Sequence, residues 1–190
     1  MEQFKSRGYM LTTTLKYLRE GLGPVRGPLA LSKITPETLR IIESSKPAEW
    51  YPCALQVEMY EGIIFAAQGD LALAEKDLVG VGKFGANEAI NSFLKLLMKV
   101  LTPTLFAKKL PSLYERDNSK GKVTVEVSDD RLVCNIDDCK GCAHLAPVSS
   151  GWATFALEAM GKKLSKSVIH GWSFDDPDSG KVSFELNWKV

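Results

Sequence analysis

The sequence has no charge imbalance, no long apolar run and only two histidines. Its 24 lysines and arginines balance 23 acidic residues, which leaves a net charge of +1 at pH 7 and no global field that would favour nucleic acid or an anionic membrane. The longest apolar stretches fall short of the ~18 residues needed to span a bilayer, and the first residues lack the apolar core of a signal peptide. We therefore expect a cytoplasmic protein that binds no nucleic acid and has no membrane span.

Several catalytic and nucleotide-binding motifs are also missing. No Gly-Lys-Ser/Thr occurs, and Ser149 and Ser150 lack the G-x-S-x-G turn of a hydrolase, so we interpret them as helix caps. The glycines from Gly80 to Gly85 match G-x-G-x-x-G, but a helical pattern precedes them, whereas the dinucleotide motif follows a strand. We interpret them as a turn or a close helix contact. Paired aspartates lie in predicted turns, and we predict that the protein is not an enzyme.

The clearest pattern that is present lies in the last third of the chain. Apolar and polar residues alternate over 182–190, which places the apolar side chains on one face of a strand. A turn rich in Asp, Pro and Gly joins this strand to the extended run 167–174, so the two predict a hairpin. Alternation over 123–127 and again over 132–136 predicts a second hairpin.

Helical spacing dominates the remainder of the chain. One helix is predicted between the hairpins, starting at Ser149 or Ser150. The N-terminal part is predicted to contain helices at 9–20, 36–43 and 87–101, one helical run between Pro52 and Gly69, another beginning at Asp70, and a segment after Pro103 that breaks near Pro111. Residues 21–27, which contain Pro24 and precede Pro28, are predicted to form a connecting loop.

These elements predict an α+β fold. A helical part over 1–118 is followed by a ββαββ antiparallel sheet part over 119–190. Because 190 residues suit one core, and because the helices have little polar separation from the sheet, we expect a single domain over 1–190.

One short run of the chain carries candidate metal ligands. It supplies three thiols and an imidazole within eleven residues, namely Cys134, Cys139, Cys142 and His144. A tetrahedral zinc site is chemically feasible here, because Gly141 permits the tight turn of a zinc knuckle. Against zinc, Cys134 shares a strand face with apolar neighbours and suits a core position. Loop thiols and a redox pair are the other interpretations, the redox pair being weakest because Pro147 follows before the predicted helix begins.

Aromatic side chains near the predicted interface of helix and sheet are candidate ligand contacts. Trp152 and Phe155 lie on the helix between the hairpins, and His170 and Trp172 lie on the strand that follows. We interpret His170 first as a core histidine, and alternatively as a polar group within an apolar ligand cavity.

The order of several helices followed by strand, strand, helix, strand, strand resembles a known ligand-binding fold. Haem-dependent nitric-oxide sensor domains, four-vinyl-reductase domains and small subunits of vesicle-tethering complexes share that fold. More closely, the chain looks like an uncharacterised paralogous family abundant in myxobacteria, which implies a bacterial protein. The residues that carry this resemblance are Tyr17 to Glu20, Trp50 to Pro52, Gly69-Asp70, Gly121, Gly151 and Trp188.

The resemblance implies an apolar pocket between helices and sheet, or a helical face used for dimerisation or partner docking. Two hypotheses follow from it. The first is a regulatory, sensor-like signalling module that binds a small apolar ligand. The second is a protein interaction or dimerisation module with a packed interior, such as a homodimer. The absence of an internal cavity of the few hundred Å³ usual for ligand sites would argue against the first, and a strict monomer with no exposed apolar patch would weaken the second.

We do not expect haem in this chain. The related sensors hold haem with a histidine on a helix and bind its propionates with a Tyr-x-Ser-x-Arg motif. Here His144 is predicted in a loop and His170 on a strand, and the run from Tyr114 to Arg116 does not match the motif.

Overall fold

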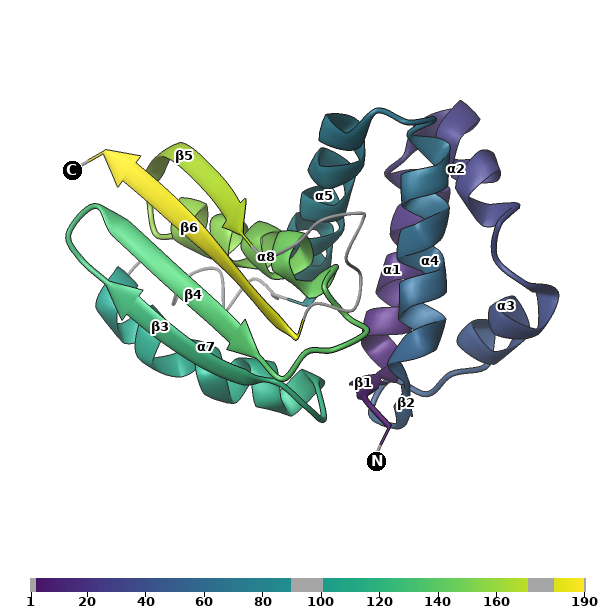
Figure 1. The fold of residues 1–190 in the computed structure, drawn as a ribbon, viewed down its shortest axis with the longest axis horizontal. Helices are drawn as coiled ribbons and strands as arrows, with labels where there is room; N and C mark the ends of the chain where they lie inside the picture. Colours follow the sequence, from purple (N-terminus) through teal and green to yellow (C-terminus); the bar gives the residue numbers. More distant parts are fainter. Residues whose placement is uncertain (1–2, 90–100, 171–179, 190) are drawn as a thin grey trace.

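The computed structural model describes residues 3–89, 101–170 and 180–189. Within these ranges a group of helices comes first and an antiparallel sheet follows, which confirms the predicted α+β fold. Figure 1 shows the helices α1, α4 and α5 side by side, with the sheet and the helices α7 and α8 next to them. No helix in this described part of the chain is long and apolar enough to cross a membrane.

Among the described residues up to Ala89, five helices make up most of the chain. They are α1 (Gly8–Glu20), α2 (Gly23–Leu31), α3 (Pro36–Glu43), α4 (Cys53–Ala66) and α5 (Leu71–Ala89). Two short strands that the sequence did not predict, β1 (Lys5–Arg7) and β2 (Trp50–Pro52), pair antiparallel beside the start of α1. The helix α3 begins as predicted, because the Thr35 hydroxyl accepts a hydrogen bond from the Thr38 amide at 3.2 Å and Pro36 occupies the first turn.

The predicted loop over 21–27 is wrong, because most of it belongs to α2. Pro24 lies in the first turn, where a missing amide hydrogen costs little. Pro28 lies inside the helix and is unfavourable there. Tertiary packing offsets this cost, since a Cβ atom at Gly62 of α4 would lie only 2.6 Å from the carbonyl oxygen of Ala30. The absence of that atom lets α2 pack directly on α4.

Helix α5 continues through the glycines from Gly80 to Gly85, for which the sequence left a turn and a close helix contact as alternatives. A side chain at Gly82 would overlap the carbonyl oxygen of Val148, and one at Gly151 would overlap that of Val79. Gly82 and Gly151 therefore let α5 and α8 (Leu145–Ala159) pack closely against each other. The predicted helix over 87–101 lies mostly outside the described residues.

The predicted break near Pro111 is also wrong. Helix α7 (Pro103–Asp117) runs through this proline. Its buried residues Phe106, Ala107 and Leu110 precede Pro111, and Tyr114 continues the same stripe beyond it. Because this stripe packs against β3 (Lys122–Val127), tertiary burial holds the helix together across the proline.

Both predicted hairpins are present and combine into one antiparallel sheet. Its strand order is β3-β4-β6-β5, with β4 at Arg131–Asp137, β5 at Lys163–His170 and β6 at Lys181–Lys189. On β6 the alternation holds, since Val182, Phe184, Leu186 and Trp188 are all buried. The helices α7 and α8 lie behind the sheet in Figure 1, so they cover the face that carries these side chains.

His170 is not a core residue, contrary to the first interpretation of it. The strand β5 is an edge strand with a register shift between Leu164 and Lys166. In the resulting register Ile169 lies opposite the buried Phe184, while His170 lies opposite Ser183 and is exposed. The shift changes which residues face the core, and sequence alternation alone does not reveal it.

Helix α8 begins earlier than predicted, directly after His144 rather than at Ser149 or Ser150. Pro147 is tolerated because it lies in the first turn. The helix joins the two parts of the molecule, because Val148 packs with the buried residues of the helical part and Leu157 packs with those of the sheet part.

Candidate functional site

A pocket lies where the helices meet the inner face of the sheet. Its volume is about 120 Å³, and its lining comes from α1, α4, α5, α7, α8 and three strands of the sheet. The volume is below the few hundred Å³ set above for a ligand site. It approaches the ~150 Å³ of an apolar cavity that holds benzene. The pocket therefore suits a small molecule.

Most of the pocket wall is apolar. Val123, Ile136 and Phe184 contribute from the sheet, and Leu110 and Trp152 contribute from α7 and α8. The Trp152 ring is stacked on Phe106, with ring centroids 5.9 Å apart. This stacking fixes the position of a large flat side chain at the wall.

Three of the polar residues in the lining carry a buried polar atom without a partner. They are Gln56 of α4, Tyr114 of α7 and Asn118, which follows α7. Gln56 is 1% exposed and Asn118 is 6% exposed. The Gln56 Oε1, Tyr114 hydroxyl and Asn118 Oδ1 atoms have no hydrogen-bond partner in the protein. Buried polar atoms are usually paired, so these three atoms, which are enclosed by the protein and not exposed to the pocket space, are unusual.

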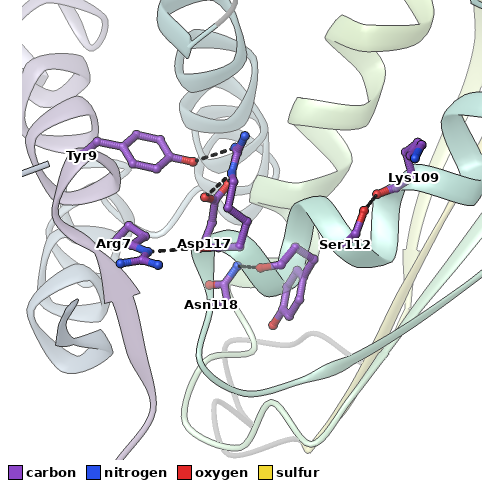
Figure 2. A network of polar contacts seen from close by, with 8 residues as sticks. Arg7, Tyr9, Lys109, Ser112, Asp117 and Asn118 are labelled. Carbon is purple, nitrogen blue, oxygen red and sulfur yellow. Dashed lines mark hydrogen bonds and ion pairs between the residues drawn. The ribbon is translucent and has the colours of Figure 1, made fainter. Parts of the chain in front are cut away.

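An ionic network closes one side of the pocket and is shown in Figure 2. Both carboxylate oxygens of Asp117 accept hydrogen bonds from Arg116, each at 2.8 Å. Arg116 also donates to the Tyr9 hydroxyl at 3.4 Å. Asp117 and Tyr9 line the pocket, so the acidic charge next to the pocket is neutralised by a bidentate partner.

The tyrosines of the pocket stay protonated over the physiological range. Burial, followed by the neighbouring thiols, raises the pKa of Tyr114 above its ordinary value. Burial, followed by Asp117, raises the pKa of Tyr9. Both hydroxyls therefore remain neutral donors near the pocket.

Of the four side chains predicted to contact a ligand, one lines the pocket and two others in the described part of the chain do not. Trp152 lines the pocket. Phe155 is partly buried against the sheet core and is not among the described lining residues. His170 is exposed on β5, and Trp172 lies outside the described residues.

The predicted metal ligands are all buried but do not converge. Cys134 lines the pocket from β4. Cys139 lies between β4 and α8, where its thiol contacts the Ile136 carbonyl oxygen at 3.6 Å. The described ranges contain no group of three or more His, Cys, Asp or Glu side chains placed to hold a metal ion. Nothing in the structure therefore supports zinc.

The structure brings together two cysteines that lie far apart in the sequence. Cys53, the first residue of α4, lies beside Cys142, and this contact together with burial raises the pKa of the Cys142 thiol. Both residues line a second, open pocket of about 460 Å³ on the surface. All four cysteines lie within the described residues, and none of them forms a disulfide.

His144 lies outside the pocket and is 5% exposed. Its ring faces Tyr60 with centroids 5.6 Å apart, and its Nδ1 atom has no hydrogen-bond partner. Burial lowers the pKa of His144 to about 4. The imidazole is therefore neutral near pH 7 and acts as a packing group.

The sequence interpretation missed Gln56, Tyr114 and Asn118. A signal for Gln56 was present, because it precedes Tyr60 and Ile63 by four and seven residues and so shares their buried helical face. A polar residue on an apolar stripe indicates an internal polar contact. Tyr114 follows Leu110 by four residues in the same way.

No protein-family model matches the chain, and no curated protein is significantly similar to it in sequence. Solved structures of H-NOX proteins, however, match its fold. A point mutant of the H-NOX protein from K. algicida, in the Fe(II) unliganded form, has a TM-score of 0.67 at 13% identity, over 97% of both chains. An oxygen-binding H-NOX domain related to soluble guanylate cyclases has a TM-score of 0.59 at 10% identity, over 97% of this chain and 95% of that one. An H-NOX protein from S. oneidensis has a TM-score of 0.56 at 11% identity, over 97% of this chain and 96% of that one.

These likenesses show the fold and confirm the resemblance to the sensor fold inferred from the order of elements. At 10 to 13% identity they show no shared ligand, because one fold can carry many functions.

Haem is the group that the fold implies, since another similar structure was solved to probe haem distortion in the H-NOX family. The pocket does not fit a histidine-ligated haem. Neither of the two histidines is among the lining residues: His144 packs against Tyr60 and His170 is exposed. The volume of about 120 Å³ is also well below the ~300 Å³ at which sites for larger ligands begin.

Proposed function

We propose that this chain is a non-enzymatic regulatory module that binds a small molecule with an apolar body in the pocket between helices and sheet. One observation carries the proposal: an apolar pocket of about 120 Å³ at the junction of the two parts. A module with a fully packed interior would have no such space. The pocket is smaller than the few hundred Å³ usual for ligand sites, but it has room for a molecule of about benzene size, and this room supports ligand binding over the interaction-module alternative.

The position of the pocket supports a regulatory role. Its lining includes helices α1 and α5 on one side and strands β3, β4 and β6 on the other. A ligand bound there would contact both parts at once, and it would stabilise whichever arrangement of the two parts it binds more tightly.

We propose that the ligand binds the protein directly and not through a haem group. Small size is the main restriction, because a molecule much larger than benzene exceeds the pocket volume. The likeness to an oxygen-binding H-NOX domain supports a sensor-like role, and the pocket chemistry of this chain supports a different ligand.

The proposal is tested with toluene as the probe and with one variant that fills the pocket. Gly85 lines the pocket on α5, and a Cβ atom there would meet only Thr13 Cγ2, at 3.8 Å. Gly85→Leu should therefore fold and place a side chain in the pocket. We expect saturable binding of toluene to the wild-type chain by calorimetry, and roughly tenfold weaker binding to Gly85→Leu.

Gly85→Ala is the matched control, because it changes the same backbone position while filling little space. It should bind toluene nearly as the wild type does. If the wild type binds neither toluene nor phenol, or if Gly85→Leu binds both as the wild type does, the proposed function is wrong.

A further inference from the structure

Two cysteines from different parts of the fold lie against each other, away from the apolar pocket. Cys53 is the first residue of α4, and Cys142 lies in the connection between β4 and α8. Their side chains are in hydrogen-bonding contact, and this contact is the main cause of the raised pKa of Cys142. Both residues line the open surface pocket of about 460 Å³. The fold therefore brings together two sulfur atoms that are distant along the chain.

The other two cysteines are placed less favourably for a reaction with Cys142. Cys134 lies on β4 and lines the apolar pocket. Cys139 is close to Cys142 in the sequence, but its thiol contacts the Ile136 carbonyl oxygen at 3.6 Å, and it does not line the surface pocket. Its influence on the pKa of Cys142 is also weaker than that of Cys53. Among the four thiols, Cys53 is thus the best-placed partner of Cys142.

The contact joins the helical part of the chain to the sheet part. Figure 1 shows the start of α4 beside the connection that leads from β4 to α8. Cys53 belongs to α4 but is buried among the core residues of the sheet part. Gln56 and Leu145, which follow the two cysteines by three residues each, line the apolar pocket. A covalent bond between the two sulfur atoms would therefore tie two walls of that pocket together.

We propose that Cys53 and Cys142 form a disulfide when the protein meets a small-molecule disulfide such as oxidised glutathione. One protein sulfur, as its thiolate, attacks a sulfur of oxidised glutathione, breaks its S–S bond and releases the first glutathione. The second protein sulfur loses its proton and attacks the mixed disulfide, which forms the protein S–S bond and releases the second glutathione. Both glutathione sulfurs end as thiols, so two electrons pass from the protein to glutathione.

Burial slows this reaction without preventing it. Cys53 is 2% exposed and Cys142 is 3% exposed, and a thiol that keeps its proton is a poor nucleophile. Exchange should therefore take much longer than labelling of an exposed thiol. At equilibrium the folded chain should favour the bond, because the two thiols are already in contact, whereas the unfolded chain must close a loop of about 90 residues.

Digestion of the wild-type chain with trypsin identifies the bond. Cleavage after Lys140 separates Cys139 from Cys142. The four cysteines are then divided among three fragments, namely 41–76 with Cys53, 132–140 with Cys134 and Cys139, and 141–162 with Cys142.

The folded protein is kept with oxidised glutathione until its mass is constant, and its remaining thiols are blocked in denaturant before digestion. We expect fragment 41–76 to be linked to 141–162 within one chain. The proposal is overturned if no protein disulfide forms. It is equally overturned if the main product is a bond within 132–140, a link between 132–140 and 141–162, or a link between two chains.

A variant that keeps only the proposed pair tests whether the fold promotes the bond. Cys134→Ala combined with Cys139→Ala leaves Cys53 and Cys142 as the only thiols, and circular dichroism confirms that it is folded. At one total glutathione concentration, half oxidation should occur at a ratio of oxidised to reduced glutathione roughly tenfold or more lower in native buffer than in urea. An equal or higher ratio in native buffer would show that the folded chain does not accommodate the bond.

Two single variants provide a matched comparison. Cys142→Ala should abolish the link to fragment 41–76, whereas Cys139→Ala makes the same change at a neighbouring buried thiol and should keep it. If Cys53 bonds to Cys139 in the Cys142→Ala variant as fully as it bonds to Cys142 in the wild type, the pairing is not specific and the proposal is wrong. None of these measurements involves a bound ligand, so each result leaves the proposed function unaffected.

Discussion

Gly82 of α5 lies directly against the carbonyl oxygen of Val148 on α8, with no space for a side chain between the two helices. This contact joins the helical part of the chain to the helix that covers the sheet. It also forms part of the pocket wall, because both residues line the pocket.

Gly82→Ala should destabilise the protein by about 2–3 kcal/mol, since the added methyl group forces α5 and α8 apart. Gly85→Ala is the control on the same helix, where the new methyl group has room. It should be neutral or stabilising by about 0.5–1 kcal/mol, because alanine favours a helix. Urea unfolding of the two variants measures both effects, and equal stability of the two would contradict the close contact.

The same contact leads us to propose that the whole chain is one domain. Helix α8 shares buried residues with both parts, so the parts should unfold together. Far-ultraviolet circular dichroism and tryptophan fluorescence should then give coincident unfolding curves for the wild type. Two separate transitions would indicate two domains.

His144 should make the stability fall in acid. Burial lowers its pKa from 6.5 to about 4, so between these values the unfolded chain binds a proton that the folded chain does not. The contribution of this group is therefore fully present above about pH 6.5 and is lost as the pH falls towards 4. The free energy of unfolding should decrease by about 3 kcal/mol from this residue alone.

Urea unfolding between pH 7.5 and pH 4.5 measures this effect. His144→Phe keeps a ring against Tyr60 and should show a weaker loss of stability in acid than the wild type. His170→Gln removes the exposed histidine and should keep the dependence of the wild type. An unchanged slope for His144→Phe would show that the imidazole is already charged or solvated in the folded state.

The cysteines should react slowly with thiol reagents in the folded protein. All four are buried, and burial raises the pKa of Cys134 to about 12 and that of Cys139 to about 11. The reactive thiolate is therefore scarce at neutral pH. We expect little labelling by iodoacetamide under native conditions and labelling of all four thiols in denaturant, counted by mass spectrometry.

Ser165→Cys provides the control for reagent activity, because Ser165 is exposed on the edge strand. This variant should take up one label quickly in the native state. Rapid native labelling of Cys53 or Cys142 would contradict the prediction and would mean that the reagent reaches these thiols through the surface pocket that they line.

Arg7 should stabilise the junction between the start of the chain and α7. It donates to the Ala48 carbonyl oxygen at 2.5 Å and to that of Arg116 at 3.1 Å, and its guanidinium lies 3.9 Å from the Trp50 ring centroid. Arg7→Leu should lower the free energy of unfolding by about 1–2 kcal/mol, since two carbonyl oxygens lose a charged donor.

Arg19→Leu is the comparison, because Arg19 forms an exposed ion pair with Glu43 and such pairs contribute little. Denaturant unfolding of both variants should place Arg7→Leu clearly below Arg19→Leu. The reverse order would show that the hydrogen bonds of Arg7 are replaced by water without loss.

The sequence predicted correctly those elements whose pattern depends only on residues that are close to one another along the chain. Alternation on β6 placed Phe184 and Trp188 in the core, and Pro36 with Thr35 marked the start of α3. The proline-containing helices were missed for the opposite reason. A helix that contains Pro28 or Pro111 is unfavourable in isolation, and packing against α4 or β3 makes it stable.

The sequence by itself determined that helices precede a ββαββ sheet, because strand alternation and helical spacing are properties of the chain at short range. Only the tertiary structure decided that β4 pairs with β6 and that His170 faces outward. It also decided that Gln56 and Asn118 share one pocket. These relations join residues that are distant along the chain. They depend on how whole elements pack, which no local pattern encodes.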